Sequence, residues 1–323
     1  MVAATIWSRS WWISTTHISP ADGLRAGGTA ARQDRAGLGI ALILTAWLLF
    51  TVVDTTVKWL VLAGLAAFQL AFLRYAVSFG LTLIVGAGSG RLFGRVTALQ
   101  AALLCLRAGL LVSATVCNFY ALRFLSLTVT SAIMFSSPIL VCALSVPLLG
   151  ERVGPKRWFA ILLGFAGVLG VVRPFGEEFH WATLLILYSA TALALFSIIT
   201  RRLSGEIAPQ VMQSYTGAMG TVVLFPFALW TWQTPTGSEQ WLLCLLFGAC
   251  AWGGHELFAR AHLFAGASTL MPFSYSYLVN MSVASWLIFA SLPDAFTVLG
   301  AGIIVLSGLI IWRQETRAGE PHV

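Results

Sequence analysis

The residues of this sequence that could do chemistry are a few ionisable side chains set inside long apolar segments. Asp54 and Lys58 lie four residues apart in the first of these segments, and Arg74 lies in the second. His255 and Glu256 adjoin in a later one. An ionisable group inside a bilayer is costly unless it is paired or hydrated, so each is a candidate for ligand binding or proton transfer.

Asp54 and Arg74 fall at similar predicted depths, roughly 9 Å and 12 Å from the same membrane face. They can form a pair if their helices are neighbours. Lys58 competes for Asp54, because residues four apart share a helical face. Two interpretations stay open: a binding cluster for an anion or zwitterion near the outer entrance, or a neutralised structural pair with Lys58 reaching toward water.

A histidine beside a carboxylate is suited to carrying protons. Adjacent helical residues point about 100° apart, however, so we expect Glu256 to pair with Arg260, four residues on, rather than with His255. His255 is then either a proton carrier or a hydrogen-bond donor to another helix. Asp54, His255 and Glu256 are the candidates for proton coupling.

Polar and aromatic side chains are densest between residues 269 and 290, where Ser276, Tyr277 and Asn280 share one helical face. Aromatic walls with a few fixed hydrogen-bonding groups are typical of a small-molecule pocket. Hydrogen bonds that merely join helices are the alternative. The predicted substrate-binding residues are Trp47, Asp54, Arg74, Asn118, Tyr120, Ser137, Trp252, Tyr275, Tyr277 and Asn280.

The elements that must position these residues are transmembrane helices. Of 323 residues, 58% are hydrophobic and only 10% are charged, whereas soluble domains carry about 25% charged residues. Apolar runs of 18 or more residues recur and are too long for barrel strands. The predicted spans are 38–60, 66–86, 101–121, 127–149, 157–173, 180–200, 210–232, 241–262, 269–290 and 296–312.

Most Lys and Arg residues fall on one side of the membrane if the N-terminus is cytoplasmic, which is the orientation that the positive-inside rule favours. We therefore expect a multi-pass protein of a cell inner membrane with both termini in the cytoplasm. Residues 1–36 are predicted to be a mobile cytoplasmic head, and residues 314–323 a cytoplasmic tail.

The chain also looks doubled. Residues 127–173 read as a span, a short loop and a span with spaced glycines, and residues 269–312 repeat that layout. Five spans per half is an odd number, so the second half enters the membrane with opposite topology. Inverted repeats of this kind are typical of secondary transporters, which bind substrate near the midplane between the halves. The predicted fold is an all-α membrane protein with two inverted five-helix repeats.

Short motifs in both halves resemble those of the EamA-like transporters of the drug/metabolite transporter superfamily. They are Ser136-Ser137-Pro138-Ile139, Leu149-Gly150-Glu151-Arg152, Gly254-His255, Pro272-Phe273-Ser274-Tyr275 and Leu292-Pro293-Asp294-Ala295. The resemblance places the repeats at 37–173 and 180–313. It implies alternating access and, often, export of amino acids or related metabolites. Some relatives import riboflavin or S-adenosylmethionine. Ala290-Ser291 departs from the Gly-Glu that the family usually has there.

The favoured function is export of a small metabolite, with import of a vitamin- or nucleoside-like metabolite as the alternative. A channel or an intramembrane enzyme is the rival class, but no phosphate loop, catalytic triad or metal-spaced cluster is recognisable. The five cysteines lie scattered in apolar blocks. We expect no cofactor, metal or nucleic acid. The expected partners are the bilayer, a small-molecule substrate and protons, for a monomer or homodimer.

Overall fold

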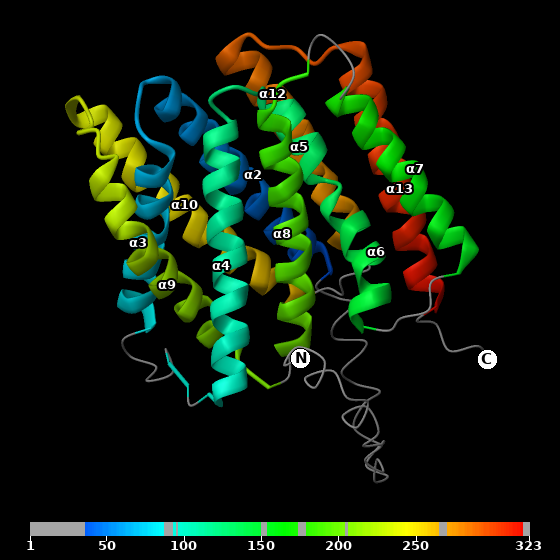
Figure 1. Ribbon diagram of the computed structural model, residues 1–323, viewed down its shortest axis with the longest axis horizontal. Coiled ribbons are helices and arrows are strands. Elements are labelled where there is room, and N and C mark those ends of the chain that lie inside the picture. Colours follow the sequence, from blue (N-terminus) through cyan, green and yellow to red (C-terminus); the bar gives the residue numbers. More distant parts are fainter. Residues whose placement is uncertain are drawn as a thin grey trace, which may run out of the picture.

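The computed structural model describes residues 36–86, 93–94, 96–149, 154–173, 179–203, 206–264 and 270–318, and these form an all-helical bundle (Figure 1). The helices are α2 (Ala36–Leu62), α3 (Ala67–Gly86), α4 (Ala98–Ala121), α5 (Leu127–Met134), α6 (Ser137–Leu149), α7 (Pro155–Val172), α8 (Ala182–Leu203), α9 (Pro209–Trp230), α10 (Gly237–Phe264), η4 (Met271–Tyr275), α12 (Ser276–Phe289) and α13 (Ala295–Ala318). The predicted head lies outside the described residues except for Ala36.

The prediction of ten spans in an all-helical membrane protein is confirmed, with two corrections. The α-helical pattern is interrupted in the spans predicted at 127–149 and 269–290: two turn residues separate α5 from α6, and the 3₁₀ segment η4 runs directly into α12. Each break has a proline close by, Pro138 or Pro272, which lacks a backbone donor and disfavours an uninterrupted helix. α13 itself continues past residue 313 to Ala318, so the first residues of the predicted tail are helical.

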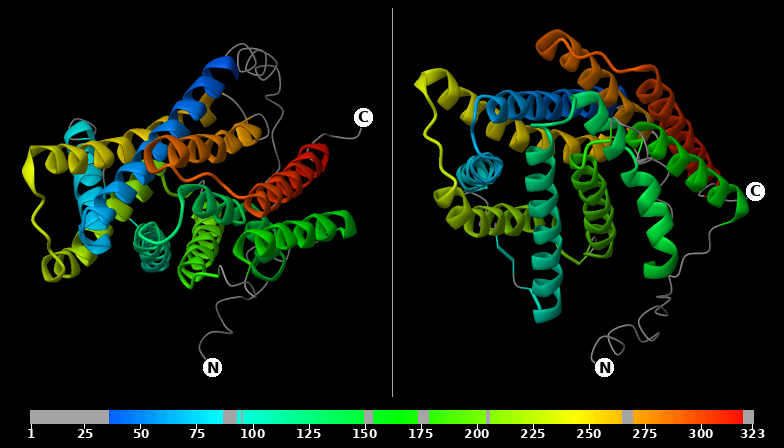
Figure 2. Two further views of the ribbon diagram at one scale, coloured as in Figure 1. Left: turned by 90° about the horizontal axis from the view of Figure 1, so that it is seen from above. Right: turned by 45° about the horizontal axis from the view of Figure 1, so that its top comes forward.

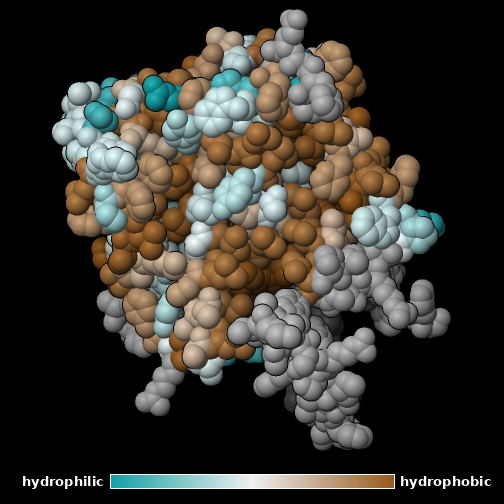
Figure 3. Space-filling model, viewed as in Figure 1, coloured by the Kyte–Doolittle hydropathy of each residue, from teal (hydrophilic) through white to brown (hydrophobic). Residues whose placement is uncertain are grey.

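Seven helical segments of the described chain are long and apolar enough to cross a membrane by themselves, and α7 contains a shorter apolar stretch, Trp158–Val172. Large apolar side chains such as Val222, Leu242 and Leu169 point outward. Hydrophobic residues cover most of the middle of the face in Figure 3, and polar ones gather along its upper edge. A surface of this kind faces lipid, because exposing so large an apolar area to water would be unfavourable.

Helices that are consecutive in the chain are not always neighbours. α10 packs along α2 and also against α3, whereas α2 and α3 barely touch (Figure 2). α4 packs against α8 and α9. α7 and α13, the last helix of each half, form a pair of their own (Figure 2). The two halves of the chain are therefore interleaved.

The α7–α13 pair is held by a close approach of backbones. A Cβ atom added at Gly300 would lie 2.7 Å from the carbonyl oxygen of Gly167, and one at Gly167 would lie 2.8 Å from that of Gly300. Ser307 Oγ donates to the carbonyl oxygen of Ala160 at 2.6 Å. Small residues allow membrane helices to pack this closely, and any side chain at either glycine would separate them.

The departure from the family's Gly-Glu motif lies at the start of the α12–α13 connection. Ala290 ends α12 with a φ of 50°, in the left-handed region that favours glycine. Asp294 caps α13 by accepting a bond from the Thr297 amide at 2.9 Å and forms an ion pair with Arg173 of the first half. An acidic residue in this loop thus caps a helix and pairs with a basic residue, although no glutamate stands at position 291.

Candidate functional site

The two broken spans meet at the centre of the bundle. Phe135, at the α5–α6 break, stacks on Tyr275, at the η4–α12 break, with ring centroids 5.2 Å apart. Tyr277 also lies against Phe135, at 6.2 Å. These breaks occupy corresponding places in the two halves of the chain. Transporters with inverted repeats use such discontinuous helices to build a binding site near the midplane.

Asp54 lies in this region and is bonded from two other helices. Its carboxylate accepts a hydrogen bond from the Tyr277 hydroxyl of α12 and a 3.4 Å bond from Asn118 Nδ2 of α4. The side chain is buried, with 9% exposed. A carboxylate removed from water requires donors of this kind. Asp54 therefore joins the first half of the chain to the second.

Arg74 forms the other charged centre, on α3. Its Nη1 donates to Thr115 Oγ1 at 3.1 Å, and its Nη2 lies 3.2 Å from His255 Nε2. The Tyr75 hydroxyl lies 3.0 Å from the same threonine oxygen. A guanidinium can only donate, so His255 Nε2 must accept and carry no proton. This bond also crosses between the halves.

The predicted pairing around Asp54 differs in its detail. Within the described residues no ion pair joins Asp54 to Arg74 or to Lys58 at contact distance, but Arg74 lies near enough for its positive charge to attract the Asp54 carboxylate. Lys58 does not reach water. Its ammonium is buried and donates to the carbonyl oxygens of Leu122 at 3.0 Å and Leu125 at 2.5 Å. These carbonyls lie just past the end of α4, where the helix dipole is negative.

Glu256 pairs with Arg260, as the helical spacing predicts, with Arg260 Nε 2.7 Å from the carboxylate. Both side chains are well exposed. His255 instead turns inward, where its ring lies 5.0 Å from Phe50. The structure therefore does not bring His255 and Glu256 together.

An aromatic wall borders Asp54. Trp47 lies two helical turns before it on α2, and its ring contacts Tyr277 at 5.3 Å, Phe50 at 5.7 Å and Phe258 at 5.8 Å. Three aromatic residues of this wall, the Phe135–Tyr275 stack and the two charged centres together form what we call the central cluster. Its members are Trp47, Phe50, Asp54, Arg74, Tyr75, Thr115, Asn118, Phe135, His255, Tyr275 and Tyr277.

Three buried polar atoms of the central cluster have no hydrogen-bond partner among the described residues: Trp47 Nε1, Arg74 Nε and Asn118 Oδ1. Two are donors and one is an acceptor. Buried polar groups in folded proteins almost always have a hydrogen-bond partner, so such a set indicates a binding position for a polar ligand. A cavity of about 20 Å³ adjoins Arg74 and His255, which is room for about one water molecule. The site is closed in this conformation.

The remaining predicted residues lie elsewhere or make no bond in the cluster. Tyr120 is 40% exposed and contacts Phe124 and Trp181 at the surface. Trp252 and Asn280 are half-buried and make no ring contact or hydrogen bond within the described chain. Ser137 is buried at the start of α6.

Sequence reasoning missed Phe50, Tyr75, Thr115 and Phe135. Thr115 had a usable signal, because it precedes Asn118 by three residues on the same helical face. Phe135 directly precedes the Ser136-Ser137-Pro138 motif. Phe50 and Tyr75 resemble ordinary packing residues in an apolar span, and only their neighbours on other helices distinguish them.

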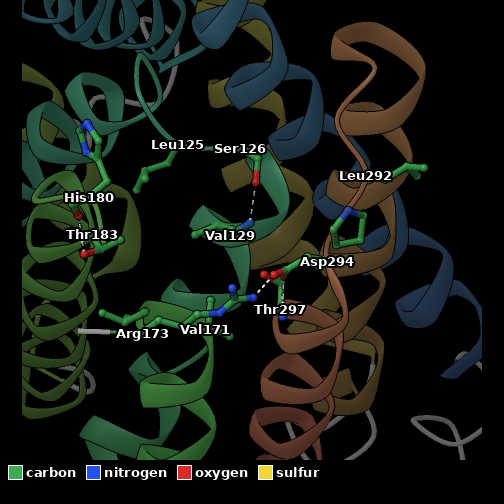
Figure 4. Close-up of a pocket in the computed structure, with 12 residues that line it drawn as sticks. Leu125, Ser126, Val129, Val171, Arg173, His180, Thr183, Leu292, Asp294 and Thr297 are labelled. Carbon is green, nitrogen blue, oxygen red and sulfur yellow. Dashed lines mark hydrogen bonds and ion pairs between the residues drawn. The ribbon is translucent and has the colours of Figure 1, made fainter. Parts of the chain in front are cut away.

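A larger cavity, of about 270 Å³, lies at one end of the bundle between α5, α7, α8 and α13 (Figure 4). The Arg173–Asp294 ion pair forms part of its wall, with His180 and Thr183 across from it. None of its lining residues belongs to the central cluster. Among the described residues, no group of His, Cys, Asp or Glu side chains is placed to hold a metal ion.

An all-helical membrane bundle whose two halves share a closed polar cluster at their broken helices defines a multi-pass membrane transporter of a small molecule. The chain belongs to the EamA-like transporter family, whose model matches residues 37–173 and 180–313. These two matched segments are consistent with inverted repeats. Membership in a family of transporters also sets aside the enzyme alternative.

Several characterised proteins are similar to this chain. A riboflavin transporter of Vibrio cholerae is 34% identical over 58% of this chain and 62% of its own length, less than two thirds of that protein. An S-adenosylmethionine uptake transporter of Rickettsia felis is 30% identical over 62% of this chain and 67% of its own. A pseudopaline exporter of Pseudomonas aeruginosa is 26% identical over 86% and 96%.

A solved crystal structure has the same fold. It superimposes with a TM-score of 0.59 over 88% of this chain and 99% of its own, at 16% sequence identity. That likeness concerns the fold alone.

Proposed function

We propose that this protein is a secondary transporter that moves a small metabolite by alternating access, with the substrate bound at the central cluster. The observation that carries the proposal is that both charged centres form a hydrogen bond from one repeat to the other. Asp54 bonds to Tyr277, and Arg74 bonds to His255. A substrate that replaced either bond would change how the two repeats hold each other, which is what alternating access requires.

Export of an amino acid or related metabolite is the proposed direction. The similarity to a pseudopaline exporter, over 86% of this chain and 96% of that protein, supports it. Cells that make the protein are expected to tolerate toxic amino-acid analogues better than cells with an empty vector, and to release more of them into the medium. Cells with the Asp54→Asn variant serve as the control. A covalently changed product formed by the purified protein, without net transport in vesicles, would contradict the proposal.

Import of a vitamin-like metabolite is the second candidate, and the 34% sequence identity with a riboflavin transporter over 58% of this chain favours it. The two directions separate in one growth assay. A riboflavin-requiring bacterium that makes the protein should grow at low external riboflavin only if the protein imports the vitamin.

We also propose that the protein lies in a cell inner membrane with both termini in the cytoplasm, on the strength of its Lys and Arg distribution. Reporter fusions at Arg202 and after Ala318 are expected to read cytoplasmic, and one near Glu178 periplasmic. A periplasmic signal after Ala318 would refute this topology.

Asp54 and His255 remain the proposed sites of proton coupling, because both belong to the central cluster and bond across the two repeats. Glu256 is a weaker candidate than the sequence suggested, since it lies at the surface in an ion pair.

A further inference from the structure

The charges buried within the bundle do not balance. Among the described membrane-spanning residues, Lys58, Arg74 and Arg107 carry positive charges inside the bundle, while Asp54 is the only carboxylate buried there. Glu256 and Arg260 neutralise each other at the surface. The interior therefore has a positive surplus, which an isolated protein sustains only at a cost.

Both arginines form their hydrogen bonds with neutral partners, and for Arg74 the nearby charge of Asp54 compensates one positive charge of the three. Arg107 is buried on α4, with 6% exposed, and its Nε donates to Thr200 Oγ1 at 2.7 Å. Its Nη1 donates to Thr216 Oγ1 at 2.8 Å and to the Met212 carbonyl at 3.2 Å, and its guanidinium lies 4.1 Å from the ring centre of Phe196. No carboxylate is among these contacts. Lys58 differs, because it binds the negative end of α4.

The two arginines are connected through one small cavity. Arg74 and His255 line it from the central cluster. Thr216 of α9 lines it as well, and this threonine accepts a hydrogen bond from Arg107. Ser78, Thr82 and Gln213 supply further polar groups. The lining residues extend from the central cluster toward the end of the bundle where α3 ends and α9 begins, so Arg74 lies at this cavity and Arg107 lies one hydrogen bond behind it.

We propose that the transported substrate is an organic anion whose carboxylate or phosphate group binds Arg74, with Arg107 as a second positive group along its path. The proposal rests on the transport function proposed above. Arg74 Nε is an unsatisfied donor at this position, and Trp47 Nε1 is a second unsatisfied donor in the central cluster. Asp54 is already bonded by Tyr277 and Asn118, so it offers little to a substrate ammonium group. The positive surplus repels cations, which gives selectivity by charge.

The test uses purified protein in liposomes and a small-molecule extract of the cells that make it. The extract is separated at pH 7 on an anion exchanger into a retained, anionic fraction and an unretained fraction of neutral, zwitterionic and cationic compounds. Mass spectrometry then identifies what enters the liposomes above the protein-free background. The compounds taken up are expected to come from the retained fraction.

Variants connect the charge of the substrate to Arg74. Arg74→Gln should reduce anion uptake about tenfold or more, because it removes a charge-assisted bond. Arg74→Lys should recover part of it. Arg260→Gln, at the surface, is the matched control and should leave uptake unchanged. Thermal unfolding of each purified variant shows that it is folded.

The outcomes separate the two proposals. Uptake from the unretained fraction alone would overturn the anionic substrate while transport itself stands, and this result needs no variant. Anion uptake that persists unchanged in folded Arg74→Gln would overturn the role of Arg74. No uptake from either fraction by the wild-type protein would overturn the proposed transport function instead.

Discussion

Replacing Asp54 with asparagine is expected to reduce transport more than about tenfold while leaving a folded protein. The amide keeps the shape of the side chain and one acceptor oxygen, but it loses the charge that receives bonds from Tyr277 and Asn118. Hydrogen bonds to a charged group contribute about 1.5–3 kcal/mol, and each 1.4 kcal/mol corresponds to about a factor of ten. Initial transport rates in proteoliposomes, normalised to folded protein, measure the effect.

A double-mutant cycle identifies the partner of Asp54. The effects of Tyr277→Phe and Asp54→Asn on the transport rate, expressed as free energies, should be coupled by about 1.5–3 kcal/mol. Either change removes the same charged hydrogen bond between the repeats. Lys58→Gln should be nearly additive with Asp54→Asn, since Lys58 binds main-chain carbonyls instead. Tyr120→Phe, at the surface, is the control for the loss of a tyrosine hydroxyl outside the central cluster. Additive losses for Asp54 and Tyr277 would show that the two side chains do not interact.

The second large effect is expected at the α7–α13 interface. Gly300→Ala should destabilise the protein by about 1–3 kcal/mol, the usual cost of overpacking. The new methyl group would meet the backbone of Gly167 at 2.7 Å and that of Val171 at 3.0 Å, so the helices would have to separate. The unfolding temperature of the purified variant measures the loss.

Gly302→Ala is the matched control, two residues further along the same helix. A Cβ atom there meets nothing within 4 Å, so the change should be neutral or slightly stabilising through better helix propensity. Equal losses for the two substitutions would mean that the α7–α13 contact is looser than described and that the destabilisation has another origin.

The sequence by itself determined the membrane class, the ten spans and the doubled layout. Each follows from local patterns: long apolar runs, turn residues between them, and similar motifs in both halves. It also singled out Asp54, Arg74, Asn118, His255 and Tyr277, because a polar group in an apolar run is conspicuous without knowledge of its neighbours. The pairing of Glu256 with Arg260 was also predictable, because both residues lie four positions apart on one helix.

Only the tertiary structure decided which of these side chains meet. Similar depth on consecutive helices suggested that Asp54 pairs with Arg74. The two charges do attract each other, but in the described chain no ion pair joins them, and each residue forms a hydrogen bond to the other repeat. Order along the chain fixes the depth of a residue in the membrane, not which helix lies beside it, because the interhelical packing of small and large side chains sets that arrangement. The bonds of Lys58 and Arg107 depend on the same packing, and so does the meeting of the two broken helices at Phe135 and Tyr275.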